Sequence, residues 1–87
     1  MNEANFQAFC KEQVVMYFNI HVDKTEKEIT ANDVYIVWMC KTLQNNKALL
    51  STNVSDGMYY EITYNGDKNE AYVDVYKKWE NFAVKGE

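Results

Sequence analysis

Val34 to Thr52 is the stretch that most constrains how this chain can fold. It contains ten mostly apolar residues, a polar break at residues 44–47 and a second apolar run. Its first five residues, 34–38, are all β-branched or aromatic, and such side chains favour a pleated strand over a helix. We therefore predict a central β-hairpin with strands over residues 34–43 and 48–52.

Two further strands are predicted after this hairpin. Apolar or aromatic side chains alternate with more polar ones over residues 58–64 and again over residues 71–79, which is the period of a half-buried strand. Residues 53–57 end in an Asp-Gly pair suited to a turn with positive φ. Asn65-Gly66 indicates a hairpin turn, which the polar residues 67–70 can lengthen. In the tail, Phe82 and Val84 could extend the last strand.

An amphipathic α-helix is predicted over residues 3–20. Its apolar side chains recur at spacings of three and four, and Asn2 or Asn5 can cap its start. Residues 23–28 contain no apolar side chain and are expected to form a solvated connection, with Ile29 pinning its far end. Residues 30–33 have the spacing of a capping box, which favours one helical turn before the first strand. The apolar positions of the helix are Phe6, Phe9, Cys10, Val14, Tyr17 and Phe18.

The 87 residues, 47% of them hydrophobic and none of them proline, indicate one folded domain over 1–87. A chain of this length buries roughly 60 to 65% of its unfolded surface, enough for one core. The predicted fold class is α+β, with one N-terminal helix packed on a four-stranded antiparallel β-meander. The helix is expected to cover only one face of the sheet.

The charge balance and the two cysteines constrain the kind of partner and the cellular compartment that we expect. Thirteen acidic residues against nine lysines, with no arginine, give a net charge of −4, which disfavours binding to nucleic acid. Cys10 and Cys40 each lie in an apolar run and are expected to be buried free thiols. Because there is no leader-like N-terminus and no apolar run near 18 residues, we expect a cytoplasmic protein without a membrane segment.

The sequence contains no pattern that supports catalysis or cofactor binding. His21 is the only histidine and is expected at the surface near the helix end, and the spacing of Cys10, Cys40 and His21 does not match zinc motifs. No Gly-x-Ser-x-Gly elbow or glycine-rich phosphate loop is present. Glu61 and Asp74 are expected to be cross-strand neighbours. We predict no enzyme, no metal and no cofactor.

The first strand has apolar residues on both of its expected faces. Because the single helix can cover only one face of the sheet, apolar side chains on the other face are expected to be exposed unless a partner buries them. Such a surface, rich in aromatic residues, is typical of recognition sites. The alternative, that the tyrosines are ordinary cross-strand packing pairs, stays open. The residues predicted to bind a partner are Tyr35, Lys41, Tyr59, Tyr72 and Tyr76.

The segments VYIVWMCKTLQNNKALLST and YYEITYNGDKNEAYVDVYKKWEN carry a resemblance to known sequences. Together they resemble a family of small, functionally uncharacterised proteins of phages and prophages of Gram-positive bacteria. The likeness covers Thr30 to Asn81 and is most specific over residues 40–50 and 64–70. It implies a protein that works inside an infected or lysogenic bacterial host by occupying another protein.

These observations lead to one principal hypothesis and two alternatives. The first is a non-enzymatic accessory protein that binds a host or phage protein, in counter-defence or regulation, through the aromatic sheet face or a strand edge. The second hypothesis is a small module that binds a ligand or single-stranded nucleic acid by stacking on the tyrosines. A structural homodimer that buries this face against itself is the third.

Overall fold

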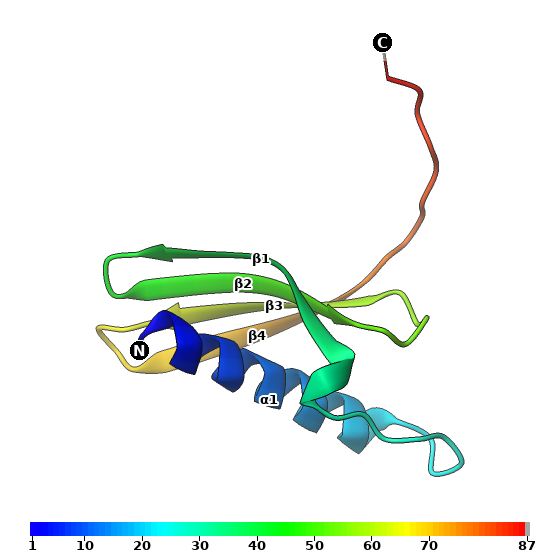
Figure 1. The fold of residues 1–87 in the computed structure, drawn as a ribbon, viewed down its shortest axis with the longest axis horizontal. Helices are drawn as coiled ribbons and strands as arrows, with labels where there is room; N and C mark the ends of the chain where they lie inside the picture. The colour runs from blue at the N-terminus through cyan, green and yellow to red at the C-terminus, as the bar shows by residue number, and fades with distance from the viewer. Residues whose placement is uncertain (87) are drawn as a thin grey trace.

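The computed structural model describes residues 1–86, which form one helix and one sheet (Figure 1). Helix α1 spans Glu3–His21, and a short 3-10 turn, η1, spans Ala31–Asp33. Each strand is antiparallel to the next, and the order in the sheet is β1-β2-β3-β4. The predicted α+β class, one helix on a four-stranded antiparallel meander, is confirmed. The strands are β1 Val34–Thr42, β2 Asn45–Thr52, β3 Met58–Asn65 and β4 Glu70–Lys77.

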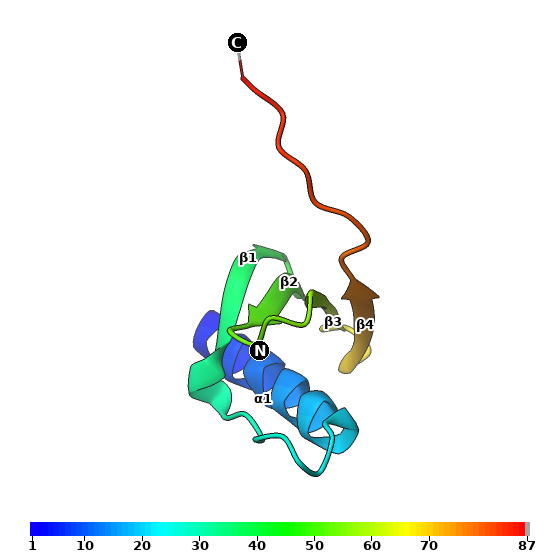
Figure 2. The same ribbon diagram turned by 90° about the vertical axis from the view of Figure 1, so that its right-hand side faces the viewer.

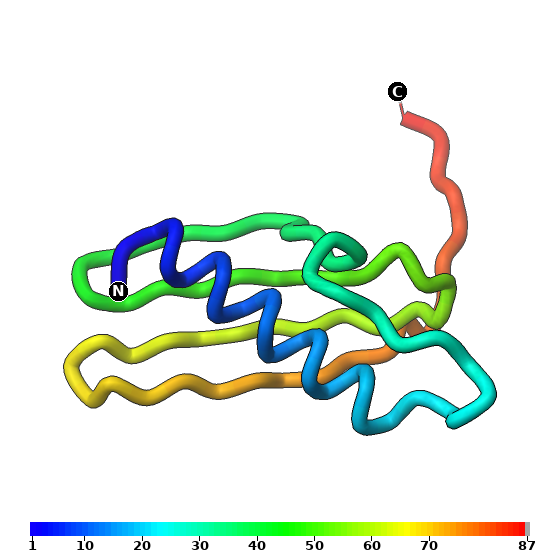
Figure 3. Tube along the Cα trace, turned by 60° about the horizontal axis from the view of Figure 1, so that its bottom comes forward, coloured from blue at the N-terminus to red at the C-terminus, as the bar shows by residue number. Residues whose placement is uncertain are grey.

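Helix α1 buries a single row of side chains against the sheet. The buried residues, Phe6, Cys10, Val14 and Phe18, are spaced four apart, and such a row forms a ridge inclined to the helix axis. The helix accordingly crosses the sheet diagonally, starting over β1 and β2 and ending toward β4 (Figure 3). Asn2 caps its start by accepting a hydrogen bond of 2.8 Å from the backbone N–H of Asn5.

The sheet face that α1 covers, called the inner face below, supplies the other half of the core. Its buried apolar residues include Ala48 and Leu50 from β2 and Tyr60 and Ile62 from β3. Coverage weakens toward β4, where Val73 is 38% exposed although it pairs with the fully buried Ile62. One helix therefore buries the inner face most completely over the central strands β2 and β3, and the inner residues of β1 and β4 are mostly half-buried or exposed.

The β1–β2 hairpin differs from the prediction at its turn. Residues 44–47 do not form a break, because the turn consists of Leu43 and Gln44 alone and β2 begins at Asn45. Leu43 has a φ of 56°, in the left-handed region. Backbone pairing does not depend on side-chain polarity, so Asn46 enters the sheet and becomes 2% exposed. Within residues 1–86 its side-chain amide has no hydrogen-bond partner.

A β-bulge at Val37 changes the face assignment of the rest of β1. Ile36 pairs with Leu50 and Trp38 with Leu49, so Val37 is an extra residue without a partner on β2. An extra residue reverses the alternation of all later side chains relative to a regular strand. The regular alternation predicted for residues 34–43 is therefore wrong after Ile36.

The connection between α1 and β1 is held by side chains at both ends. The Asn19 amide donates to the carbonyl of Ile29 at 3.0 Å and accepts from its N–H at 2.9 Å, which confirms Ile29 as the anchor of this connection. The predicted helical turn before β1 is present as η1. There the Asp33 carboxylate accepts a hydrogen bond from the backbone N–H of Thr30 at 2.9 Å.

The C-terminal tail leaves the body of the protein after β4. The prediction extended this strand to Trp79, whereas β4 ends at Lys77. Residues 78–86 continue as extended chain on the side of the sheet opposite α1 (Figures 1 and 2). Phe82 and Val84 therefore do not extend the strand. The tail has no neighbouring strand to pair with, because its direction takes it away from β3.

Candidate functional site on the uncovered face of the sheet

Among residues 1–86 no helix or further strand covers the sheet face opposite α1, called the outer face below (Figure 2). Four of the five residues predicted to bind a partner lie on it. Tyr72 and Tyr76 of β4 are 57% and 51% exposed, and Tyr35 of β1 is exposed to a similar degree. Tyr59 of β3 is half-buried and pairs directly with Tyr76. The structure thus brings these four tyrosines onto one surface.

Lys41 does not share this surface. It pairs with the buried Asn46, so its position in the register belongs to the inner face, beside the β1–β2 turn. Its Nζ donates a hydrogen bond of 2.8 Å to the carbonyl of Leu43. The bulge at Val37 is the reason, because it moves every residue after Ile36 to the face opposite the one predicted.

The same bulge adds Trp38 and Cys40 to the outer face. Trp38 is 41% exposed and pairs with Leu49, and the exposed Cys40 pairs with Lys47. The prediction that Cys40 is buried is therefore wrong, whereas Cys10 is buried as expected. Residues 34–42 contain no glycine or other local signal that indicates a bulge. The sequence therefore offered no way to assign Trp38 and Cys40 to the outer face.

The middle of the outer face is polar. Lys47 and Glu61 form an ion pair of 3.7 Å between β2 and β3. Glu61 also pairs in register with Asp74, as predicted, so two carboxylates lie side by side on β3 and β4. The Tyr72 hydroxyl donates a hydrogen bond to the Glu70 carboxylate, and this bond raises the pKa of Tyr72. Aromatic rings thus flank a central strip of charge.

One end of the outer face is hollowed. A depression of about 450 Å³ is bounded by Tyr35, Tyr59 and Lys78 and by the loop between β2 and β3. The Nζ of Lys78 lies 5.7 Å from the centroid of the Tyr59 ring, and its backbone N–H donates to the carbonyl of Gly57 at 2.8 Å. The chain leaves the sheet at this hollow and continues as the tail.

Large apolar side chains continue along the tail. Trp79 is 97% exposed and Phe82 is 74% exposed. Together with the four tyrosines and Trp38, they form an aromatic surface on one side of the molecule. Isolated exposed apolar residues are ordinary, but this many exposed aromatic residues on one side of a small domain is typical of protein interaction sites.

Cys10 and His21, two residues of types that can ligate metals, lie on α1 and apart from the outer face. Within residues 1–86 no three His, Cys, Asp or Glu side chains gather closely enough to hold a metal ion. Burial raises the pKa of the Cys10 thiol to about 12. His21 is exposed at the end of α1, as predicted, and its Nδ1 lies 2.8 Å from the carbonyl of Tyr17.

Comparison with known proteins gives a family but no relative of known function. No helix among residues 1–86 has the length and apolar character needed to cross a membrane. Searches of curated proteins and of solved structures found no match. A model of a family of unknown function, DUF6275, matches residues 7–86, a range that includes the sheet and the tail. This chain belongs to the DUF6275 family.

Proposed function

We propose that this chain is a non-enzymatic protein-binding module whose outer face contacts a host or phage protein. The observation that carries the proposal is the set of exposed aromatic rings on the outer face. Tyrosine and tryptophan are enriched at the centres of protein interfaces, because they bury a large area and lose little conformational entropy. The tail leaves the sheet on the same side of the molecule (Figures 1 and 2) and adds the exposed Trp79 and Phe82 to the groups available to a partner.

The arrangement of charge on the outer face also suits a protein partner. The ion pair of Lys47 and Glu61 and the neighbouring Asp74 lie between the aromatic groups. A partner with complementary polar groups there would fix its orientation, while the rings supply most of the contact area. The negative net charge and the absence of arginine count against a nucleic acid in this position.

The setting we propose is a bacterium that carries a phage or prophage. This part rests on the resemblance of residues 30–81 to phage and prophage proteins of Gram-positive bacteria. In that setting a small acidic protein acts in the cytoplasm, by occupying a defence protein of the host or a regulatory protein of the phage. The free edges of β1 and β4 offer additional backbone groups for pairing with such a partner.

Quantitative capture from a Gram-positive host lysate tests this proposal. The bait is the tagged full chain, and captured proteins are compared with those from the Tyr72→Ala/Tyr76→Ala variant. We expect the partner to be captured at least about tenfold less well by the variant, as for interface hot spots. The matched control is Met16→Ala/Ile20→Ala, which removes exposed apolar side chains from α1 on the opposite side and should not reduce capture.

Equal capture by the wild-type and the tyrosine variant would show that the outer face is not the binding surface. Sedimentation velocity of the purified chain at high concentration tests the homodimer alternative. A dimer that buries the outer face would be present in the wild-type and lost in the same tyrosine variant. Titration of a fluorescent single-stranded oligonucleotide at low salt tests the remaining alternative, and we expect no binding.

A further inference from the structure

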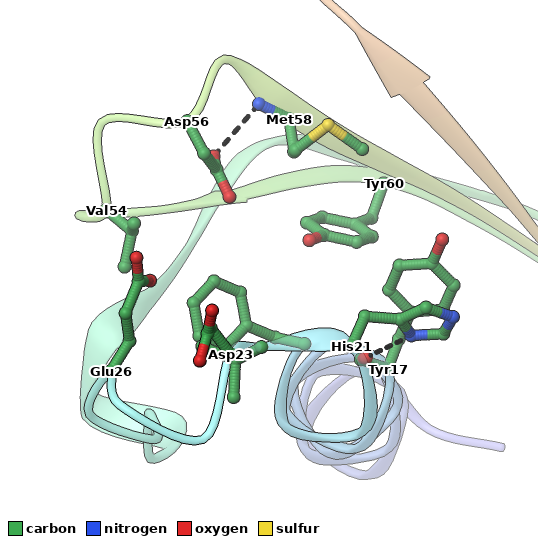
Figure 4. Close-up of a pocket in the computed structure, with 10 residues that line it drawn as sticks. Tyr17, His21, Asp23, Glu26, Val54, Asp56, Met58 and Tyr60 are labelled. Carbon is green, nitrogen blue, oxygen red and sulfur yellow. Dashed lines mark hydrogen bonds between the residues drawn. The ribbon is translucent and has the colours of Figure 1, made fainter.

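A pocket of about 300 Å³ lies on the inner side of the molecule (Figure 4), and the loop between β2 and β3 borders both this pocket and the hollow on the outer face. It forms where the C-terminal end of α1 meets β3 and the loop between β2 and β3. Its volume is at the lower end of the range for small-ligand sites. The residues that determine its chemistry are Tyr17, His21, Asp23, Glu26, Asp56 and Tyr60.

Three aromatic rings form one wall of this pocket. Tyr17 and His21 stack with ring centroids 4.1 Å apart and an interplanar angle of 23°. Tyr60 meets Tyr17 edge to face, with centroids 5.8 Å apart. The hydrogen bond between His21 Nδ1 and the Tyr17 carbonyl holds the imidazole in this stack. The faces of aromatic rings carry negative potential and attract cations.

Tyr60 is almost fully buried as a residue, and its hydroxyl makes no hydrogen bond within the described chain. The residue is 1% exposed, and Figure 4 shows its hydroxyl pointing into the pocket. The hydroxyls of Tyr64 and Tyr72, by contrast, donate to Asn69 and Glu70. Burial, aided by the Asp56 carboxylate, raises the pKa of Tyr60, so the group stays neutral and can accept a hydrogen bond.

The opening of the pocket is acidic. Asp23, Glu26 and Asp56 line it, and no lysine does. Asp23 accepts hydrogen bonds from the backbone N–H and the hydroxyl of Thr25, which lower its pKa and keep it ionised. Asp56 accepts from the backbone N–H of Met58 through Oδ1 at 3.0 Å. Each of these two aspartates has a second carboxylate oxygen available to a ligand.

We propose that this pocket binds a primary alkylammonium group, with its N–H groups on the Tyr60 hydroxyl and the rim carboxylates and its alkyl chain on the aromatic wall. A quaternary ammonium would satisfy the rings but could not donate to Tyr60. A neutral alcohol would fill the cavity but would leave the carboxylates without a counter-charge. The side chain of a lysine on another protein and a free diamine both carry this group.

The test is a titration of the isotopically labelled full chain, followed by amide chemical shifts, with n-butylammonium chloride at constant ionic strength and about pH 8, where the amine is charged. We expect saturable shifts around the pocket with a dissociation constant on the order of millimolar, as suits a ligand of about five heavy atoms. Butan-1-ol should give no such shifts, and tetramethylammonium should bind at least about fivefold more weakly because it cannot donate hydrogen bonds.

Two variants separate recognition from folding. Tyr60→Phe removes only the unpartnered hydroxyl, so binding should weaken about tenfold while the thermal unfolding midpoint stays the same or rises. Asp56→Asn keeps an oxygen for the Met58 N–H but removes the charge, and it should also weaken binding. Asp74→Asn, on the outer face, is the matched control and should leave binding unchanged.

The source of the ammonium group is distinguished by two further ligands. If Nα-acetyl-lysine methylamide saturates at the same or a lower concentration than cadaverine, the pocket suits a lysine side chain of a protein. If cadaverine binds more tightly, it suits a free diamine. Equal binding of butan-1-ol and n-butylammonium would overturn the proposal, as would unchanged affinity in Tyr60→Phe.

Discussion

Gly66 lies where the β1–β2 and β3–β4 turns meet, and it has no room for a side chain. A Cβ at this position would overlap the carbonyl oxygen of Gln44 and lie 2.7 Å from the Gln44 Cβ. The Gly66 N–H also donates to the side chain of Asn45 at 3.2 Å, so this contact joins the ends of both hairpins. The residue is required for a close approach of two backbones.

We predict that Gly66→Ala lowers the free energy of unfolding by about 2 kcal/mol, the usual cost of overpacking a tight contact. Urea denaturation measures the change. Gly86→Ala is the matched control, because a Cβ there meets nothing within 4 Å and should alter stability by less than about 0.5 kcal/mol. A Gly66→Ala variant as stable as the wild-type would mean that the two turns do not touch.

Asp33 gives the fold a dependence on pH. Its carboxylate accepts hydrogen bonds from the Thr30 N–H at 2.9 Å and from the Asn53 amide at 3.1 Å, and these bonds lower its pKa in the folded state. A lowered pKa means that the stabilisation is fully present above the ordinary value of about 3.9 and is lost as the pH falls through the folded-state value.

We therefore expect the unfolding temperature of the wild-type to fall as the pH decreases below about 4. Asp33→Asn should melt at a lower temperature than the wild-type near neutral pH, and its melting temperature should fall less on acidification. Thermal unfolding followed by circular dichroism, near neutral pH and again below about pH 4, measures these melting temperatures. Asp67→Asn serves as the control, since that carboxylate accepts no hydrogen bond from residues 1–86. An equal acid-induced fall in Asp33→Asn and the wild-type would contradict the assignment.

At the scale of the element, the bulge in β1 determines which side chains the outer face presents. Because Val37 is unpaired, Trp38 and Cys40 lie on the outer face and Met39 turns toward the core. Regular alternation would place Cys40 in the core. The reactivity of the two thiols therefore reports the register of this strand.

We predict that one thiol per chain reacts with Ellman's reagent in the native protein and two react in urea. Cys40 is exposed, whereas Cys10 is fully buried and its raised pKa suppresses the thiolate. Cys40→Ser should abolish the native reaction, and Cys10→Ser should leave it intact. Two protected thiols in the native protein would show that β1 lacks the bulge.

At the scale of the whole molecule, the body and the tail are separable. The body ends with the hydrogen bond from the Lys78 N–H to Gly57, and beyond it the exposed side chains of Trp79 and Phe82 lie outside the core. The tail therefore adds surface for contact without adding to the folding energy of the body.

We expect a chain that stops at Lys78 to keep its free energy of unfolding within about 0.5 kcal/mol, as for surface changes without buried contacts. The same truncation should weaken capture of the partner, because it removes two large aromatic groups from the proposed binding surface. Urea denaturation and quantitative capture measure the two effects. A large loss of stability would show that the tail packs against the body.

Local patterns predicted most of the elements and part of the site. The apolar spacings of three and four over residues 3–20 predicted the helix, and the alternation from Met58 to Tyr64 predicted β3 together with the position of Tyr59. The same alternation in β4 placed Tyr72 and Tyr76 on one face. These predictions succeeded because the helix and strand periods are set within a few residues of chain.

The sequence by itself determined the fold class, the order of the elements and the tyrosines of β3 and β4, because propensity and periodicity are local properties. Only the tertiary structure decided the face of Trp38, Cys40 and Lys41, since an unpaired residue in β1 is defined by its partner strand. The same is true of the pocket around Tyr60, whose walls come from α1, β3 and two loops that are distant in sequence. Contacts of that kind depend on how the elements pack together, and no local pattern encodes them.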